Sequence, residues 1–229
     1  MKLKILAATA LFLMSSPSPA ETIVIKAAAM VDVENGALVA NPVITVTDGT
    51  IGSIASGTPS LPEGSRLIDL GDKVVMPGLI DMHVHFMGKA TDQGYRRLAI
   101  SHERAAITGV MNARTTLMAG FTTVRNVGAP SFSDVALRDA IAAGDVPGPR
   151  MFVSGPAIGI TGGHCSDNNL LPEEFGIVGE GVADGPWAAR AKVRRNIKYG
   201  VDLIKTCSTG GVLSKGTQVG APQYTVEEL

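Results

Sequence analysis

The chain has 229 residues, and its 20 lysines and arginines nearly balance its 21 aspartates and glutamates, giving a formal net charge of −1 at pH 7. A charge so close to zero argues against a nucleic-acid partner, which calls for a strongly basic surface. The hydrophobic fraction of 45% and the 27 glycines are typical of a packed, enzyme-like globular domain and argue against disorder.

Residues 1–20 read as a secretory signal peptide. Two lysines precede an apolar run over residues 5–14 that is too short to span a bilayer, and Ser18 and Ala20 provide a small-residue cleavage site. Removing this segment leaves 18 basic and 21 acidic residues, a net charge of −3. We therefore expect an exported protein, periplasmic or secreted, without a stable membrane anchor.

Residues 21–76 are predicted to form an all-β module. The short strands are expected at residues 22–25, 41–47, 51–54 and 67–75. Asp48-Gly49 is a turn signal between two of these strands. The module contains no cluster of titratable residues, so we interpret it as structural.

After Pro77 the pattern changes to strands that alternate with helices. The predicted strands are 79–86, 121–127, 150–154 and 201–206, and the predicted helices are 95–119, 133–144 and 184–200. Gly120, Gly144 and Gly200 are placed to end the three helices, and Ser133 is expected to cap the second. Four successive βα-type units favour an α/β fold with a parallel sheet and helices outside it.

Two architectures are compatible with such a sheet: a doubly wound sheet and a TIM (β/α)₈ barrel. No Gly-rich phosphate fingerprint follows the first strand, and the unusual residues fall at strand C-termini, which favours the barrel. The 147 residues from His83 to Leu229 compare with roughly 250 in a whole barrel. We therefore interpret residues 77–229 as the first half of a barrel.

The end of the chain supports this interpretation. Thr225 is followed three residues later by Glu228, which is a capping box and announces a helix of ten or so residues. Only about one turn of that helix is present. We therefore expect the sequence to be an N-terminal fragment of a longer chain.

Two of the four histidines lie two residues apart in the first predicted barrel strand. Because side chains alternate along a strand, His83 and His85 share a face with Asp81, which we interpret as structural. Neutral imidazoles side by side suit zinc and other borderline divalent metals, although a hydrogen-bonded pair of core histidines is the alternative. The opposite face is apolar and is expected to pack beneath the helices: Ile80, Met82, Val84 and Phe86.

Lys205 is the second unusual residue, because it lies in a strand that otherwise reads as buried. A buried lysine must be neutralised or paired, and a deprotonated amine can take up carbon dioxide to become a carbamate, an anionic oxygen ligand. A lysine that reaches solvent along its aliphatic stem, or pairs with an acid, is the alternative.

Four segments resemble the metal-dependent amidohydrolase superfamily, in its imidazolonepropionase-like branch with the Xaa-Pro dipeptidases. They are MPGLIDMHVHF, AGFTTVRNVG, GPRMFVSGPAIGITGGH and KYGVDLIKTCSTGGVLS. The resemblance covers nearly all of residues 22–229. It implies a β-sandwich, of which residues 21–76 are the N-terminal part, followed by the barrel with one or two divalent metals, usually zinc.

The resemblance also implies roles for particular residues. His83 and His85 match the metal ligands of the first strand, and Lys205 matches the carboxylated lysine that bridges two metals. Histidines on the fifth and sixth strands and an aspartate on the eighth complete the family's site. The aspartate is the catalytic base and is expected beyond Leu229, so no catalytic residue of this kind is present and we expect the fragment alone to be inactive.

Two further residues are hypothesised to bind substrate. The Gly-rich segment 155–185 is expected to lie over the metal face, where His164 could contact a substrate carboxylate or the scissile carbonyl. Tyr224 could similarly contact a carboxylate. A purely structural role for His164 is the alternative, and His102 is predicted to be a surface or packing residue in the middle of a helix.

The only two cysteines, Cys165 and Cys207, flank the predicted site residues. An oxidising compartment permits a disulfide, but the sequence does not establish one, and thiolates are also weak rivals for the metal. Whether the two cysteines pair is therefore left open.

The resulting functional hypothesis is a metal-dependent hydrolase of C–N amide bonds that uses a metal-activated hydroxide. Its expected substrates are small peptides, as for a dipeptidase, or N-acyl amino acids. The alternatives are a cyclic-amide hydrolase or deaminase of the same superfamily, or a non-catalytic fragment if the chain ends at Leu229. The expected partner is a small-molecule or peptide substrate rather than a nucleic acid, and homo-oligomerisation is left open.

Overall fold

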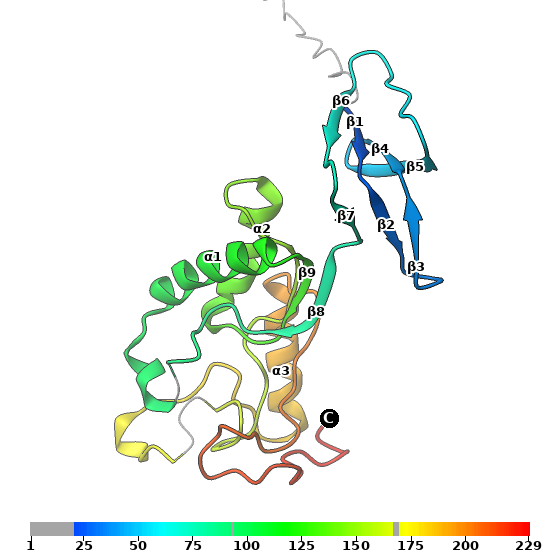
Figure 1. Cartoon of the computed structure of the whole chain (residues 1–229). Helices are drawn as coiled ribbons and strands as arrows, with labels where there is room; N and C mark the ends of the chain where they lie inside the picture. Colours follow the sequence, from blue (N-terminus) through cyan, green and yellow to red (C-terminus); the bar gives the residue numbers. More distant parts are fainter. Residues whose placement is uncertain (1–20, 93, 167–169) are drawn as a thin grey trace, which may run out of the picture. The chain divides into compact units, whose positions relative to one another are not determined.

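The computed structural model describes residues 21–92, 94–166 and 170–229, so the predicted signal peptide lies outside the described residues. The chain divides between Pro77 and Gly78 into two compact units, which are described separately (Figure 1). Within the described ranges no helix combines the length and the apolarity that crossing a bilayer requires.

The first unit consists of two small β-sheets. The four-stranded sheet has the order β5-β4-β1-β6, with strands Thr50–Ser56, Pro42–Thr47, Thr22–Lys26 and Arg66–Asp69. The three-stranded sheet has the order β3-β2-β7, with strands Ala37–Ala40, Ala29–Asp32 and Val74–Val75. β1 pairs antiparallel with β4 and parallel with β6. The expected strands are present, and the predicted stretch 67–75 is divided between β6 and β7.

Sequence patterning missed the β2–β3 hairpin. Its turn places Gly36 at a φ of 66°, and the Asp32 carboxylate accepts hydrogen bonds from the backbone N–H groups of Glu34 and Asn35. The dipeptide Asn35-Gly36 is a recognised hairpin signal and could have revealed this turn. The flanking strands, each four residues long, lack a clear apolar alternation.

The second unit contains a parallel three-stranded sheet with the order β10-β9-β8. The strands are β8 Leu79–Val84, β9 Phe121–Asn126 and β10 Arg150–Val153. The helices are η1 Gly94–Ala99, α1 His102–Met118, η2 Pro130–Phe132, α2 Ser133–Ala143, η3 Glu173–Phe175 and α3 Gly185–Lys198. α1 packs against β9 and α2, and α2 packs against β10. This is the predicted βα alternation (Figure 1).

The predicted helix over residues 95–119 is two helices. Ser101 caps α1, because its side chain accepts a hydrogen bond from the backbone N–H of Arg104 at 3.2 Å, and a separate 3₁₀ turn precedes it. Gly120 and Gly144 follow α1 and α2 with φ of 97° and 82°, so the predicted helix ends are confirmed. Ser133 is the first residue of α2 rather than its cap.

The fourth predicted strand, 201–206, does not form as a regular strand. The segment is paired with its neighbour at isolated positions instead of along a ladder. There the Ile158 N–H donates to the Lys205 carbonyl and the Ile158 carbonyl accepts from the Cys207 N–H, both at 2.8 Å. The reason is that β10 ends at Val153 and the chain turns at Gly155, whose φ is 63°. The neighbour of the segment is therefore mostly a loop.

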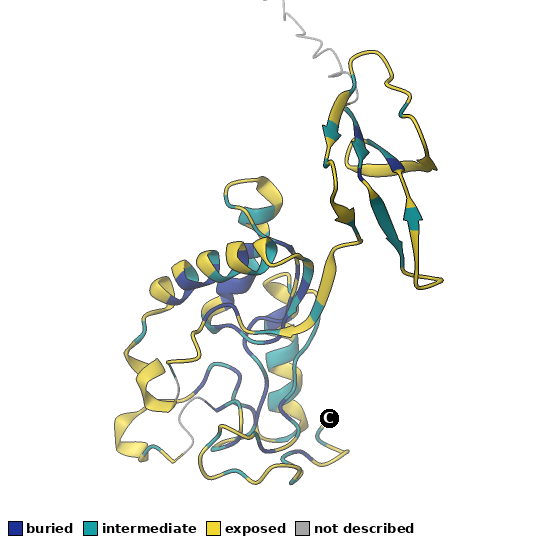
Figure 2. Ribbon diagram, viewed as in Figure 1, coloured by how far each residue is buried: buried dark blue, intermediate teal, exposed yellow. Residues whose placement is uncertain are grey.

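Most of the core of the second unit lies between the sheet and the helices α1 and α2. Its buried residues are Phe86, Met87, Ala105, Ala113, Val124, Ala129, Leu137, Met151 and Val153. The expectation that Ile80 and Met82 pack beneath the helices is wrong, since they are 61% and 53% exposed (Figure 2). Among the described residues β8 pairs with β9 alone, so its other edge is uncovered.

Candidate active site

The predicted metal ligands His83 and His85 lie side by side at the C-terminal end of β8. Their Nε2 atoms are 3.3 Å apart, and the two rings meet edge to face. His83 belongs to the strand, whereas His85 follows its last residue. The Asp81 carboxylate accepts a hydrogen bond from the His83 N–H at 2.9 Å, where the pairing of β8 with β9 shifts register. Both rings therefore lie where the strand becomes irregular.

The distance between the two nitrogens fits a shared divalent ion. Zinc binds imidazole nitrogen at about 2.0–2.1 Å, so two ligands of one tetrahedral ion are separated by roughly 3.3 Å. The separation of the two nitrogens is therefore compatible with two ligands of one ion. A direct hydrogen bond between one protonated and one unprotonated nitrogen gives a similar distance, and this is the alternative that the sequence left open.

The surroundings of His85 favour its neutral form, which is the form of imidazole that can bind a metal. Burial of its ring lowers the pKa of His85 below the ordinary value of 6.5, and the positive charges of His83, Lys205 and Arg97 act in the same direction. A hydrogen bond with the Gly128 backbone partly opposes this shift. The Nδ1 side of the ring faces Gly128, which leaves Nε2 directed at His83. A backbone partner of this kind fixes the tautomer of a ligating histidine.

Lys205 lies near these histidines although it is not in a regular strand. It is half-buried, and its charge contributes to lowering the pKa of both His85 and His164. The structure therefore brings three of the predicted site residues into one region. The backbone of Lys205 is fixed by the hydrogen bond that its carbonyl accepts from Ile158.

His164 lies in the long loop after β10 and is held from several sides. Its ring nitrogen Nδ1 makes a short hydrogen bond with Ser214 Oγ, and its backbone N–H donates to Gln223 Oε1 at 3.1 Å. The ring rests against Gly211, where an added Cβ would lie 2.0 Å from Nδ1. Burial is the main cause of the lowered pKa of His164, followed by the charges of Lys205 and Arg97. The side chain thus has a defined position, close enough to Lys205 for that charge to lower its pKa.

The Tyr224 hydroxyl is directed into the second unit and is already used in an internal hydrogen bond. The residue is 6% exposed, packs with Ile158 and Ala183, and donates its hydroxyl hydrogen bond to the Ala183 carbonyl at 2.7 Å. Burial raises its pKa to about 12. In this structure the hydroxyl is used for packing, so the geometry does not support the predicted carboxylate contact. Sequence position alone gave no indication of this orientation.

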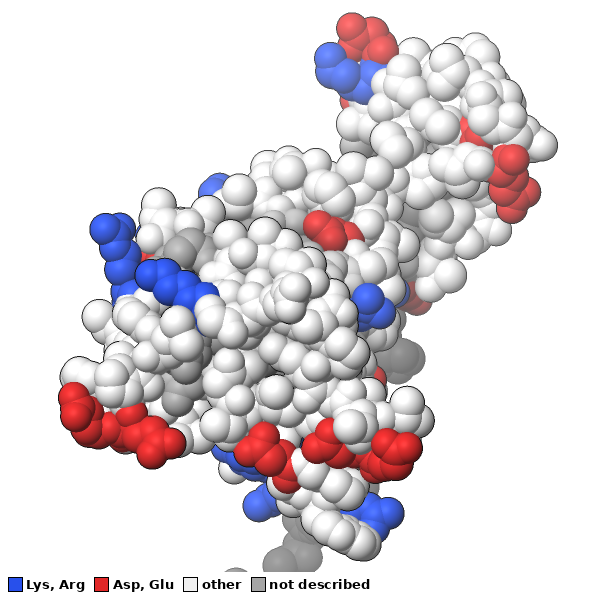
Figure 3. All heavy atoms as spheres, turned by 90° about the horizontal axis from the view of Figure 1, so that it is seen from below, with Lys and Arg blue, Asp and Glu red and all other residues white. Residues whose placement is uncertain are grey.

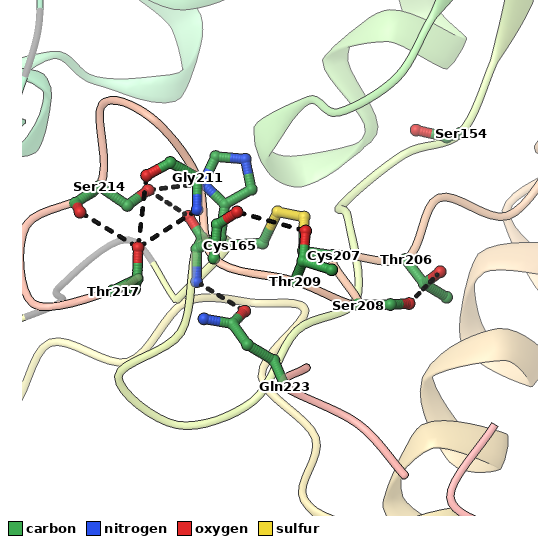
Figure 4. The surroundings of a disulfide bond; sticks show 12 residues. Ser154, Cys165, Thr206, Cys207, Ser208, Thr209, Gly211, Ser214, Thr217 and Gln223 are labelled. Atoms are coloured by element: carbon green, nitrogen blue, oxygen red, sulfur yellow. Dashed lines mark hydrogen bonds between the residues drawn. A yellow bond between two sulfur atoms is a disulfide. The ribbon is translucent and has the colours of Figure 1, made fainter. Parts of the chain in front are cut away.

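The two cysteines form a disulfide, which the sequence had left open. Cys165 follows His164 directly, and Cys207 lies two residues after Lys205, so the bond joins the two segments that carry these residues (Figure 4). Cys207 is 3% exposed and Cys165 is half-buried. The connectivity places the loop after β10 against the segment after Lys205.

His102 is more closely connected than predicted. Because Ser101 caps α1, His102 is the first residue of the helix rather than a mid-helix residue, and its Nδ1 makes a short hydrogen bond with Ser131 Oγ. The Ser131 side chain and N–H also contact the Glu180 carboxylate at 3.0 and 2.7 Å. Arg195 pairs with the same carboxylate at 3.0 Å. This network ties together the loops that follow β8, β9 and β10.

A buried polar network at the strand ends was also missed. Asn126, fully buried at the end of β9, accepts from the Phe86 N–H at 2.9 Å and donates to Asp134 Oδ2 at 3.2 Å. The same Asp134 oxygen accepts from the Gly155 N–H at 3.0 Å. Burial raises the pKa of Asp134, against the opposing effect of these hydrogen bonds. The network fixes the ends of all three strands relative to one another.

Comparison with known proteins identifies the class of protein that this fold and site represent. Residues 74–229 match the sequence profile of the amidohydrolase family, so the chain belongs to that family. The partial parallel sheet with its outer helices is accordingly the first part of the family's barrel.

Particular relatives are known in sequence and in structure. The chain is 31% identical over 176 residues to an ochratoxinase of Aspergillus niger, which covers 68% of this chain and 35% of the relative. It is 32% identical over 125 residues to an L-hydantoinase of Paenarthrobacter aurescens, covering 51% of this chain and 27% of the relative. A crystal structure of a Xaa-Pro dipeptidase with bound methionine matches at a TM-score of 0.82 and 35% identity.

The matches cover only part of each relative. The dipeptidase alignment includes 91% of this chain but 52% of the dipeptidase. The chain therefore spans about half the length of that structure, and its sequence alignment with the ochratoxinase covers about a third of that relative.

Proposed function

We propose that the chain carries the first half of the active site of an exported, metal-dependent hydrolase of C–N amide bonds. The proposed substrates are small peptides, as for a dipeptidase, or N-acyl amino acids. The observation that carries the proposal is the 3.3 Å separation of the His83 and His85 Nε2 atoms, with the charge of Lys205 close to the His85 ring.

The residues have distinct roles in this proposal. His83 and His85 hold a divalent metal, most simply zinc, and Lys205 adds an oxygen ligand after its amine takes up carbon dioxide. The metal would supply Lewis-acid polarisation of the amide carbonyl and an activated water. His164, positioned by Ser214 and Gln223, contacts the substrate carboxylate or carbonyl oxygen. The proposal assigns the role of catalytic base to none of the described residues.

The relatives support a small-molecule or peptide substrate. The names of the dipeptidase and of the ochratoxinase both indicate hydrolases. On the face drawn in Figure 3, large areas carry no charged side chain, acidic side chains gather along one rim, and basic side chains lie in small groups. Such a face suits a small ligand better than a polyanion.

A cyclic-amide hydrolase is the second candidate. The specific observation in its favour is the similarity to an L-hydantoinase, an allantoinase and a dihydroorotase, each more than 30% identical over part of the chain. A non-catalytic role is the third candidate if the chain acts alone, because β8 has an uncovered edge among the described residues.

Export is part of the proposal. The apolar N-terminal run supports it, and so does the disulfide between Cys165 and Cys207, since such bonds persist in oxidising compartments.

The test uses a protein in which this chain is joined to the remaining strands of the family's barrel. Lys205→Ala is expected to lower metal content and hydrolysis of a dipeptide and N-acyl amino acid panel at least about tenfold, with partial recovery when short carboxylic acids are added. Lys192→Ala is the control, because the Lys192 amine donates to the Glu180 carbonyl instead. Unchanged metal content and activity in Lys205→Ala would refute the ligand role, and turnover of hydantoins or dihydroorotate alone would favour the second candidate.

A further inference from the structure

Three side chains of types that can bind metal ions lie together outside the His83, His85 and Lys205 set. One ring nitrogen of His164 and the sulfur atoms of Cys165 and Cys207 lie within 4.8 Å of one another. The ligands of a tetrahedral zinc or cadmium ion are separated by roughly 3.3–3.9 Å, so the three atoms can converge on one ion once the two sulfurs have separated. None of them belongs to the His83, His85 and Lys205 set.

The disulfide prevents metal binding in the oxidised chain. A thiolate is the ligand that zinc and cadmium bind, and neither cysteine offers one while the sulfurs are joined. The bond also places the two sulfur atoms together, so the ligands are already assembled when the bond is broken. Assembly before binding reduces the entropy that ordering a site would require.

The difference in exposure between the two cysteines predicts which sulfur an external thiolate attacks. Cys165 is half-buried, whereas Cys207 is 3% exposed; Figure 4 shows the disulfide that joins them. A thiolate of an external dithiol therefore attacks the Cys165 sulfur, and Cys207 leaves with the electron pair. The second thiol of the dithiol then displaces Cys165, so that two cysteine thiols and one cyclic disulfide are produced.

Neighbouring groups hold His164 in place in the oxidised chain, and none of their contacts with the ring involves the disulfide. The Ser214 hydroxyl binds Nδ1 of the ring, and the loop that carries Ser214 is closed by Thr217, whose hydroxyl contacts the Gly211 N–H at 3.2 Å and the Ser214 carbonyl at 3.1 Å. Hydroxyl and backbone partners of this kind orient a histidine ligand. Among the described residues no hydrogen bond to the other ring nitrogen, Nε2, is found, and Nε2 is therefore assigned as the third ligand.

We propose that Cys165, Cys207 and His164 form a redox-gated Cys₂His site for a soft divalent cation of the zinc or cadmium type. In the oxidised chain the site is closed by the disulfide. In the reduced chain one cation binds two thiolates and one imidazole, releases two protons from the thiols to solvent, and keeps a fourth position for water.

Cadmium is the probe, because thiolate-to-cadmium charge transfer gives an ultraviolet absorption that nitrogen and oxygen ligands do not produce. The 229-residue chain is reduced with a dithiol, freed of reductant under inert gas and titrated with cadmium. We expect one equivalent to bind with this absorption in the reduced chain and no such absorption in the oxidised chain.

Variants separate this site from the candidate active site. Cys165→Ser is expected to reduce the absorption by about half and the affinity at least tenfold, and His164→Ala to keep the absorption but weaken binding at least tenfold. His83→Ala is the control and leaves the charge-transfer titration unchanged, so that a failed active-site proposal would not affect this result.

Three results would overturn the proposal. The first is a reduced chain without thiolate absorption at one equivalent of cadmium. The second is an absorption that Cys165→Ser does not diminish. The third is an affinity that His164→Ala does not change, which is also the result expected if reduction unfolded the chain and cadmium bound to flexible thiolates.

Discussion

The Nε2 atoms of His83 and His85 approach to 3.3 Å at the end of β8, a separation that two ligands of one tetrahedral zinc ion adopt. His83→Ala should therefore weaken zinc binding by the oxidised chain by at least about tenfold, measured by calorimetric titration. His102→Ala is the matched control, because that ring contacts Ser131 instead. Equal zinc affinity in the two variants would mean that the histidine pair is only a hydrogen-bonded contact.

Lys205 should control the protonation of its neighbours. In the metal-free chain, Lys205→Met is expected to raise the pKa of His85 and of His164, because it removes a positive charge that disfavours both imidazolium ions. Ring-proton chemical shifts followed against pH measure the change, and Lys192→Met serves as the control. If the pKa values of His85 and His164 do not change in Lys205→Met, the Lys205 amine lies too far from both rings to affect them.

The same shifts predict how stability depends on pH. Both pKa values lie below the ordinary 6.5 in the folded chain, so the unfolded chain binds more protons once the pH falls below that value. Stability is therefore expected to be fully present above pH 6.5 and to decline as the pH falls toward the folded-state pKa values. Denaturant titrations at several pH values measure this decline, which should be smaller in His164→Gln.

The buried amide of Asn126 should be a large contributor to stability. Asn126→Ala removes the acceptor of the Phe86 N–H and a donor to Asp134, and leaves both groups buried without that partner. A loss of about 2–3 kcal/mol in the free energy of unfolding is expected from denaturant curves. Asn35→Ala, at an exposed turn, should change stability by no more than about 0.5 kcal/mol. Similar losses in both variants would contradict the assigned role.

Gly211 should be required for the position of His164. An added Cβ would lie 2.0 Å from Nδ1 of that ring, so Gly211→Ala must displace the ring from Ser214. Gly88→Ala is the control, since its added Cβ would meet no atom within 4 Å. The His164 ring shifts in a ¹H–¹⁵N spectrum should move in the first variant alone. An unchanged ring in Gly211→Ala would show that the loop adjusts freely.

Helix ends and strands that depend on residues close in the sequence could be predicted from it. The ends of α1 and α2 follow from Gly120 and Gly144, which adopt the left-handed backbone that glycine favours. The β8 strand was likewise visible from its alternation. The close approach of His83 and His85 could be predicted for the same reason, since both histidines lie within one short segment, whereas their role as metal ligands stays a prediction.

Features that depend on distant neighbours could not be predicted. Tyr224 packs against Ala183, and the pairing of Cys165 with Cys207 depends on how two loops approach each other. Alternation indicates that residues 201–206 are extended but not which backbone they meet, and that backbone is mostly a loop. Asn126 has no motif to mark it, because its importance comes from three groups in separate segments.

The disulfide has a consequence for the lifetime of the molecule. Cys165 and Cys207 are 42 residues apart, and closing a loop of that length reduces the entropy of the unfolded chain by an amount worth about 4 kcal/mol at 25 °C. The enclosed stretch includes the whole of α3. In reducing surroundings this stretch would open far more often and offer its backbone to proteases. The redox potential of the compartment therefore sets how long the chain persists there.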